Sequence, residues 1–213
     1  MIQWVFEAVQ AADIASRIVV ATPDEEIIQA CRRFGCEAIL TKNTHPSGTD
    51  RIAEVAESIK ADVYVNVQGD EPLISVQTIR AAAEPLLQDH AVAMGSAFAV
   101  CPEAEIPNPA VVKVVLDRQS NALYFSRHPI PFDRNPRVLP VYKHIGIYAF
   151  RREVLFDFAG WEPTPLEVTE SLEQLRFLEN GIKIRMSEGE ASALAVDTPE
   201  QAEEVRALLE SRR

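Results

Sequence analysis

Two hydrophobic spacings alternate along the chain. Ile2, Val5, Phe6, Val9 and Ala12 recur at helical spacing, and residues 17–21, in which four apolar residues follow Arg17, then have the pattern of a buried strand. This alternation predicts an α/β fold of three layers, in which a mostly parallel sheet is covered by helices. The pattern predicts further strands over residues 37–41, 62–67, 92–100, 111–116, 145–150 and 183–187, and further helices over residues 49–59, 76–87, 152–158, 164–180 and 199–209.

Three predicted helix starts share one signature. Each has a threonine, then a proline, with Glu or Gln three positions after the threonine; the threonines are Thr22, Thr164 and Thr198. Threonine caps the helix, proline fits its first turn, and the acidic or amide side chain completes a capping box. Residues 128–143 contain four prolines, which predicts a long loop with little regular structure.

Composition limits the possible functions. The length of 213 residues fits one domain, residues 1–213, of a size that needs no disulfide or metal to fold. The net charge of −11 argues against general binding of nucleic acid or an anionic membrane, but permits a nucleotide held with a divalent cation. Three cysteines in no framework spacing predict reduced thiols. With no apolar run of about 18 residues and no signal peptide, we expect a cytoplasmic protein without a membrane partner.

The segment from Asn66 to Pro72 (NVQGDEP) carries the strongest chemical signal. A predicted strand ends there in a glycine turn with two carboxylates, at the end of the sheet where open α/β folds bind ligands. Asp70 is suited to hold a hard cation such as Mg²⁺. The alternative is an acidic turn that caps the next helix.

Two further segments have both a functional and a structural interpretation. Ser47, Gly48 and Thr49 precede a helix, where small residues let a ligand approach backbone amides; an ordinary helix cap is the alternative. Asp197 precedes the cap at Thr198 and is suited to a helix N-terminus, but paired with Asp70 it becomes a candidate second metal ligand.

The remaining candidates are isolated polar residues. Arg127 has the geometry to clamp a carboxylate with two hydrogen bonds. His144 and Tyr148 are four apart on a predicted strand, so they share a face, and Glu170 and Gln174 are four apart on a predicted helix. Each of these is more often structural than catalytic, and no pairing for a covalent nucleophile is present in the sequence.

Together these segments resemble the 3-deoxy-manno-octulosonate (Kdo) cytidylyltransferases, also called CMP-Kdo synthetases. The matching runs cover nearly the whole chain in the family's order: HPSGTDR, DVYVNVQGDEPLI, NPAVVKVVLD, ALYFSRHPIPFDR, KHIGIYAFR, EVTESLEQLRFLENG and AVDTPEQAEEVR. The resemblance implies a Rossmann-like fold of the nucleotide-diphospho-sugar transferase type. It also implies transfer of CMP from CTP to the anomeric hydroxyl of Kdo, releasing pyrophosphate, for lipopolysaccharide biosynthesis.

The resemblance also implies roles for individual residues. Asp70 and Asp197 would hold Mg²⁺; Ser47, Gly48, Thr49 and Arg51 would lie near the cytidine; Gln68 would lie between nucleotide and sugar; Arg127 would meet the sugar carboxylate; and His144, Tyr148, Glu170 and Gln174 would line the sugar pocket. Residues 108–142 would form a dimerisation arm, so the family implies a homodimer.

Members of the family begin with a strand and a basic loop of the form PAR-x-x-S-x-R-x-x-x-K, which grips the triphosphate. The present sequence begins about where the helix of that loop begins, so we expect the first strand of the sheet to be absent. The loop would then be encoded upstream of Met1, or the chain would be a truncated, weakly active copy. Two alternatives remain at this point: a cytidylyltransferase for another sugar acid such as neuraminate, or an inactive nucleotide-binding or scaffold homologue.

Overall fold

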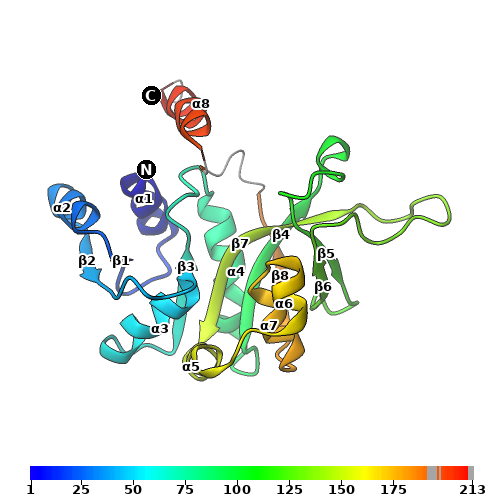
Figure 1. Ribbon diagram of the computed structural model, residues 1–213, viewed down its shortest axis with the longest axis horizontal. Coiled ribbons are helices and arrows are strands. Elements are labelled where there is room, and N and C mark those ends of the chain that lie inside the picture. The colour runs from blue at the N-terminus through cyan, green and yellow to red at the C-terminus, as the bar shows by residue number, and fades with distance from the viewer. Residues whose placement is uncertain (191–195, 197, 211–213) are drawn as a thin grey trace.

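The computed structural model of the chain describes residues 1–190, 196 and 198–210 and has helices on both faces of a central sheet (Figure 1). The strands are β1 (Val19–Thr22), β2 (Glu37–Leu40), β3 (Val63–Val67), β4 (Met94–Val100), β5 (Lys113–Leu116), β6 (Ala122–Ser126), β7 (Tyr142–Arg151) and β8 (Ile184–Glu188). The α-helices are α1 (Ile2–Ala12), α2 (Glu25–Arg33), α3 (Gly48–Ser58), α4 (Val76–Gln88), α5 (Arg152–Gly160), α6 (Pro165–Glu170), α7 (Gln174–Glu179) and α8 (Pro199–Glu210); η1 (Glu103–Glu105) is a 3₁₀ turn.

Strand β7 is central to the larger sheet because it pairs with β3, β4 and β5, in each case antiparallel. Strand β8 extends the sheet parallel to β4, and β6 extends it antiparallel to β5. The predicted α/β class and its three layers are confirmed, but the sheet is mixed rather than mostly parallel. The reason is that β7 follows a long loop instead of a crossover helix, and a parallel connection would require such a crossover.

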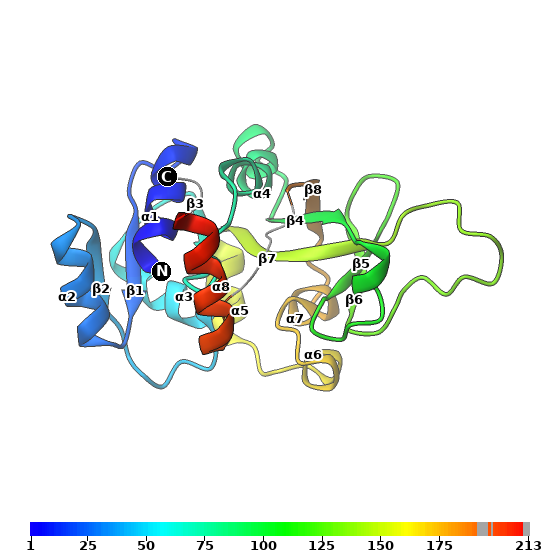
Figure 2. The same ribbon diagram turned by 90° about the horizontal axis from the view of Figure 1, so that it is seen from above.

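Strands β1 and β2 form a separate two-stranded parallel sheet. Helix α3 contacts both β1 and β3, and β1 lies between β2 and β3 in both views (Figures 1 and 2). In the described ranges, β1 pairs only with β2 and β3 only with β7. The two sheets are therefore not joined by strand pairing within the described ranges.

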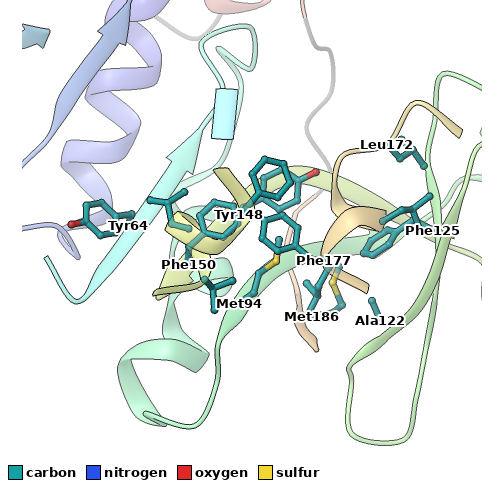
Figure 3. Packing of buried hydrophobic residues seen from close by; sticks show 14 of the residues in the cluster. Tyr64, Met94, Ala122, Phe125, Tyr148, Phe150, Leu172, Phe177 and Met186 are labelled. Carbon is teal, nitrogen blue, oxygen red and sulfur yellow. The ribbon is translucent and has the colours of Figure 1, made fainter. Parts of the chain in front are cut away.

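The two faces of the larger sheet follow the alternation of residues along its strands. Odd-numbered residues of β4 and β7, such as Ala97 and Ile147, pack with Ile79 of α4. Even-numbered residues, such as Met94 and Phe150, pack on the opposite face with helices α5 and α7. There the Phe177 ring stacks against the Phe150 ring, with centroids 5.5 Å apart (Figure 3). It also stacks against the Phe158 ring, with centroids 4.5 Å apart.

The predicted elements are confirmed except at particular boundaries and over residues 164–180, where the structure has two helices, α6 and α7, in place of one. The helix expected to start with a Thr22 cap instead has Asp24 as its N-cap, because the Thr22 hydroxyl accepts from Asp24 N–H and delays the first turn by two residues. At Thr198 the predicted capping box is present. The backbone N–H of Thr198 donates to Gln201 Oε1, and the backbone N–H of Gln201 donates to the Thr198 hydroxyl. Strand β6 was not predicted.

Residues 127–141 have no helix or strand, as the prolines predict, and they project from the body beyond β5 and β6 (Figure 2). Phe132 and Val138 in this segment are 88% and 91% exposed. None of the helices in the described ranges has the length and apolar character that a membrane crossing requires.

A buried ion pair joins α6 to α7. The Arg176 guanidinium donates to both carboxylate oxygens of Glu167, at 2.6 and 2.5 Å, and lies over the Phe158 ring. The two charged side chains are only 6% and 12% exposed, so removing one charge would leave the other unpaired in a poorly solvated position.

We predict that Glu167→Gln lowers the free energy of unfolding by about 3–5 kcal/mol, the usual cost of breaking a buried pair from one side. The Gln amide oxygen can still accept from Thr164 N–H, as Glu167 does at 3.1 Å, so the loss reports on the ion pair. The measurement is urea unfolding. The matched control is Glu203→Gln, which removes the solvent-exposed pair with Arg206 and should change the unfolding midpoint little. Equal losses for the two variants would contradict the prediction.

Candidate active site

The N-terminus of α3 presents small residues toward the end of β3. Ser47 is the N-cap of α3, as the structural alternative expected: its hydroxyl accepts from Asp50 N–H at 3.2 Å and donates to the Asp50 carboxylate at 2.7 Å. A side chain at Gly48 would approach the Gln68 amide to 3.2 Å and the Asn66 amide nitrogen to 3.6 Å. Glycine therefore keeps open the space beside these two amides.

Asn66 is a polar residue in the middle of β3 and is only 4% exposed. Its Nδ2 is buried and makes no hydrogen bond within the described part of the chain. Because an unpaired buried donor is costly, Asn66 is a strong candidate to bond a ligand in the space beside Gly48.

Arg51, the fourth residue expected near the nucleotide, is turned toward the chain that precedes α3. Its Nη1 donates to the Thr41 hydroxyl at 2.6 Å and to the Lys42 carbonyl at 2.9 Å. These bonds hold the segment between β2 and α3 in place, so Arg51 positions Ser47 and Gly48.

His144 and Tyr148 lie on one face of β7, as predicted, and their ring centroids are 5.5 Å apart. Four residues of extended strand would span about 13 Å. The distance is shorter because β7 is irregular here. Tyr148 pairs with Ser96 and His144 pairs with Phe98, so a spacing of four positions along β7 lies opposite a spacing of two along β4.

Gln174 completes this cluster from α7. The Tyr148 hydroxyl donates to its Oε1 at 3.2 Å, and its Nε2 lies 3.5 Å from His144 Nδ1. Burial lowers the pKa of His144 to about 3 and raises the pKa of Tyr148 well above its ordinary value, so both rings are neutral at pH 7.

The prediction that Glu170 and Gln174 share one helical face is wrong. Ser171 has left-handed backbone angles (φ 53°, ψ 52°) and ends α6, so Glu170 closes one helix and Gln174 opens the next. The helical pattern over residues 164–180 continues across the break because Val168, Leu172 and Leu175 recur at helical spacing, although Val168 is exposed. A non-glycine residue with such angles is strained, and such strain is often found at functional sites.

The Glu170 carboxylate bonds to the protein from three sides. It accepts from the Ser126 hydroxyl at 2.7 Å, Arg127 N–H at 2.9 Å and the Tyr124 hydroxyl at 3.4 Å. Burial raises the pKa of Glu170, but these bonds, with that from Arg127 N–H foremost, lower it overall. Glu170 thus connects β6 to the end of α6.

The Arg127 guanidinium donates to three backbone carbonyls, those of Pro109, Glu170 and Ser171, at 3.0, 2.8 and 3.2 Å. An arginine has five N–H donors, so these contacts leave one N–H on each terminal nitrogen for a ligand carboxylate. The Arg127 carbonyl in turn accepts from the Lys113 ammonium at 2.5 Å; Lys113 is fully buried and also bonds the carbonyls of Asn108 and Val111.

Asp70 lies in the exposed turn after β3. Its carbonyl oxygen accepts from Val196 N–H at 2.9 Å, which places Val196 at this turn. Asp197, the other predicted metal ligand, lies outside the described residues. The described ranges contain no cluster of three His, Cys, Asp or Glu side chains. Mg²⁺ is usually held by one or two carboxylates together with substrate phosphates, so the exposed Asp70 carboxylate fits such an ion.

The structure also reveals Glu173, which the sequence analysis missed. Thr49 Oγ donates to its Oε1 at 2.8 Å, so this carboxylate joins α3 to the break between α6 and α7. Burial raises its pKa above the ordinary value, although the Thr49 and Ser47 hydroxyls act in the opposite direction. No signal in the sequence singled out Glu173, because a glutamate beside Leu172 fits the single helix predicted over residues 164–180.

Comparison with known proteins identifies the family. Residues 1–184 match the family model described as Cytidylyltransferase. The chain is 43% identical over its full length to a 3-deoxy-manno-octulosonate cytidylyltransferase of Koribacter versatilis, covering 81% of that protein. It is 44% identical to the Escherichia coli protein of the same name, over 98% of this chain and 85% of that one. The chain belongs to the 3-deoxy-manno-octulosonate cytidylyltransferase family.

A solved structure supports the same assignment. A CMP:2-keto-3-deoxy-manno-octonic acid synthetase complexed with CTP superposes with a TM-score of 0.96 at 41% identity, covering 100% of this chain and 88% of that one. The predicted fold class and the prediction of a nucleotidyltransferase of the cytidylyltransferase type are therefore confirmed. The assignment of single residues to substrate atoms stays a prediction.

We predict that Glu173→Gln stabilises the protein above the ordinary pKa of a glutamate and not below it. Because the folded state raises the pKa of Glu173, ionisation costs stability as pH rises past the pKa of the unfolded chain. An amide cannot ionise, so the variant avoids that cost and can still accept from Thr49. Urea unfolding at pH 4 and pH 8 tests this. A gain of the same size at both values, or a loss at pH 8, would show that ionisation is not the cause.

Proposed function

We propose that this chain transfers the cytidylyl group of CTP to the anomeric hydroxyl of Kdo, forming CMP-Kdo and pyrophosphate, in the cytoplasm and for lipopolysaccharide biosynthesis. The new bond joins the anomeric oxygen to the α-phosphorus, the bond from that phosphorus to the pyrophosphate breaks, and the hydroxyl proton passes to water. The observation that carries the proposal is the meeting of His144, Tyr148 and Gln174 in one cluster, on a chain whose relatives bear the name of this reaction.

The nucleotide would bind along the N-terminus of α3. Ser47, Gly48 and Thr49 offer backbone amides and no bulky side chain, and Gln68 and Asn66 supply amide groups at the adjacent end of β3. Gln68 would lie between nucleotide and sugar. The buried Asn66 Nδ2, which has no described partner, supports a ligand acceptor at this position.

The sugar acid would bind between β7 and the break that separates α6 from α7. Arg127 would donate its two remaining N–H groups to the sugar carboxylate, and His144, Tyr148 and Gln174 would meet sugar hydroxyls with fixed donors and acceptors. Glu170 would act by holding Arg127 and Ser126 in place, since its carboxylate already accepts from both.

Asp70 and Asp197 would hold Mg²⁺. The ion would neutralise negative charge on the triphosphate. The protein as a whole cannot do so, because its net charge is −11. Support comes from the carboxylate chemistry of Asp70 and from the bond between Val196 N–H and the Asp70 carbonyl, one residue before position 197.

The test is a pyrophosphate-release assay with Mg²⁺, in which CTP, UTP and ATP are each combined with Kdo and with neuraminate. The proposal expects release with CTP and Kdo well above every other pair. Release with neuraminate instead would identify another sugar acid. Binding of CTP without release above background from any pair would favour an inactive nucleotide-binding homologue.

We predict that Asp70→Asn lowers turnover with CTP and Kdo by at least about two orders of magnitude, because metal charge stabilisation contributes several kcal/mol. The amide keeps the size of the side chain, so the thermal midpoint should not change. Asp62→Asn, which removes an exposed carboxylate just before the opposite end of β3, is the control. Near-normal turnover of Asp70→Asn would remove Asp70 from the metal site.

A homodimer formed through residues 108–142 is part of the proposal. The projecting segment exposes Phe132, Val138 and Leu139 (66% exposed), and exposed apolar clusters of this kind are typical of protein interfaces. Light scattering should give twice the chain mass of 23.7 kDa, and Val138→Asp should shift it toward the monomer. Leu87→Asp, at an exposed leucine of α4, is the control. A monomer of the unmodified protein would contradict this part.

A further inference from the structure

Ser96 lies beneath the proposed sugar pocket, and no role was assigned to it above. It is fully buried in β4, on the face that carries Met94 and Phe98, and it pairs with Tyr148 of β7. Its hydroxyl donates to the Ile147 carbonyl at 2.8 Å and lies 2.9 Å from His144 Nε2. Gly146 and Ile147 lie inside β7 at the register shift and have no partner on β4.

Counting protons determines the direction of each hydrogen bond in this chain of groups. A serine hydroxyl has one hydrogen, and the Ile147 carbonyl can only accept, so that hydrogen is used there. Toward His144 the hydroxyl can then only accept, and the proton must be on Nε2. A neutral imidazole carries one proton, so Nδ1 is left as an acceptor. Burial lowers the pKa of His144 to about 3, which keeps the ring neutral.

The bare Nδ1 in turn orients the Gln174 side chain. Only the amide nitrogen of Gln174 can donate to Nδ1, so Nε2 faces His144 at 3.5 Å and Oε1 faces the Tyr148 hydroxyl at 3.2 Å. The opposite tautomer would present an N–H at Nδ1 to the amide nitrogen of Gln174, two donors facing each other. A backbone carbonyl in the irregular part of β7 thus sets the donor and acceptor pattern of three side chains in the pocket.

We propose that Ser96 is a positioning residue, which fixes the Nε2–H tautomer of His144 and through it the orientation of the Gln174 amide toward the sugar acid. The identity of that substrate rests on the proposed function, whereas the tautomer does not. Ser96 would act through His144 and would not touch the substrate.

The first experiment measures the tautomer in the unmodified protein. Nitrogen-15 NMR of histidine-labelled protein separates protonated from bare ring nitrogens, and a His144→Asn variant assigns the His144 signals among the four histidines. We expect a protonated Nε2 and a bare Nδ1 at pH 7. A protonated Nδ1 would overturn the proposal, and this measurement requires neither a substrate nor a folded Ser96 variant.

The second experiment uses Ser96→Ala and Ser96→Thr. With alanine, Nε2–H loses its acceptor, so the Nδ1–H tautomer should appear and KM for Kdo should rise about tenfold, the effect of one misdirected hydrogen bond, while KM for CTP stays within about twofold. Threonine keeps the hydroxyl, so Ser96→Thr should have the Nε2–H tautomer and the KM for Kdo of the unmodified protein. Ser58→Ala, which removes a hydroxyl donating to the Val55 carbonyl at the far end of α3, is the control.

The outcomes separate the two claims. An unchanged tautomer in Ser96→Ala, or an equal rise of KM for CTP and Kdo, would overturn the positioning role. If the unmodified protein releases no pyrophosphate from CTP and Kdo, the proposed function fails, and the NMR result still decides whether Ser96 fixes the tautomer.

Discussion

The hydrogen-bonding of strand β7 to three neighbours is the constraint on which the site depends. A strand paired with β3, β4 and β5 cannot shift its register without breaking several ladders, so its irregular segment stays at residues 146–147. That segment brings His144 and Tyr148 opposite two residues of β4 that are only two positions apart. Two polar side chains four apart in sequence therefore meet over one small area of the sheet.

The second half of the site is built by breaking a helix. Ser171 separates α6 from α7, and the exposed carbonyls at the break are held by Arg127, which is itself held by Glu170 and Lys113. Each of these contacts is a hydrogen bond to a charged group, the stronger kind. These hydrogen bonds join the base of the projecting segment to the helix break.

The sequence predicted the elements well because hydrophobic spacing reports burial, and burial determines most strand and helix positions here. It did not predict strand direction, since β7 has the same alternation whichever way it runs. The break at Ser171 was missed because Val168, Leu172 and Leu175 keep helical spacing across it. Strand β6 was missed because Leu123 (60% exposed) is an apolar residue on its solvent side, which hides the alternation.

The residues of the candidate site also divide into those that the sequence indicated and those that only the structure shows. Gln68, which follows an apolar run, was named through the family resemblance, and His144 and Tyr148, which interrupt such a run, through their spacing of four on a predicted strand. Ser96 and Asn66 interrupt such runs as well, but a serine or asparagine is small enough to be tolerated, and only their contacts give them meaning. Glu170 was found for its spacing to Gln174, and its actual role follows from three donors that are more than 40 residues away in sequence.

The charge of the pocket fits its proposed substrates. CTP and a sugar acid are both anions, and a protein of net charge −11 repels them unless charge is arranged locally. Two groups between β7 and α7 avoid this problem by being neutral, because burial lowers the pKa of His144 to about 3 and raises the pKa of Tyr148 well above its ordinary value. A chain of hydrogen bonds between neutral groups needs no counter-charge in a buried site. It is stable only if each donor faces an acceptor. For that reason a single serine hydroxyl, fixed by a backbone carbonyl, is as important to such a pocket as a charged residue would be.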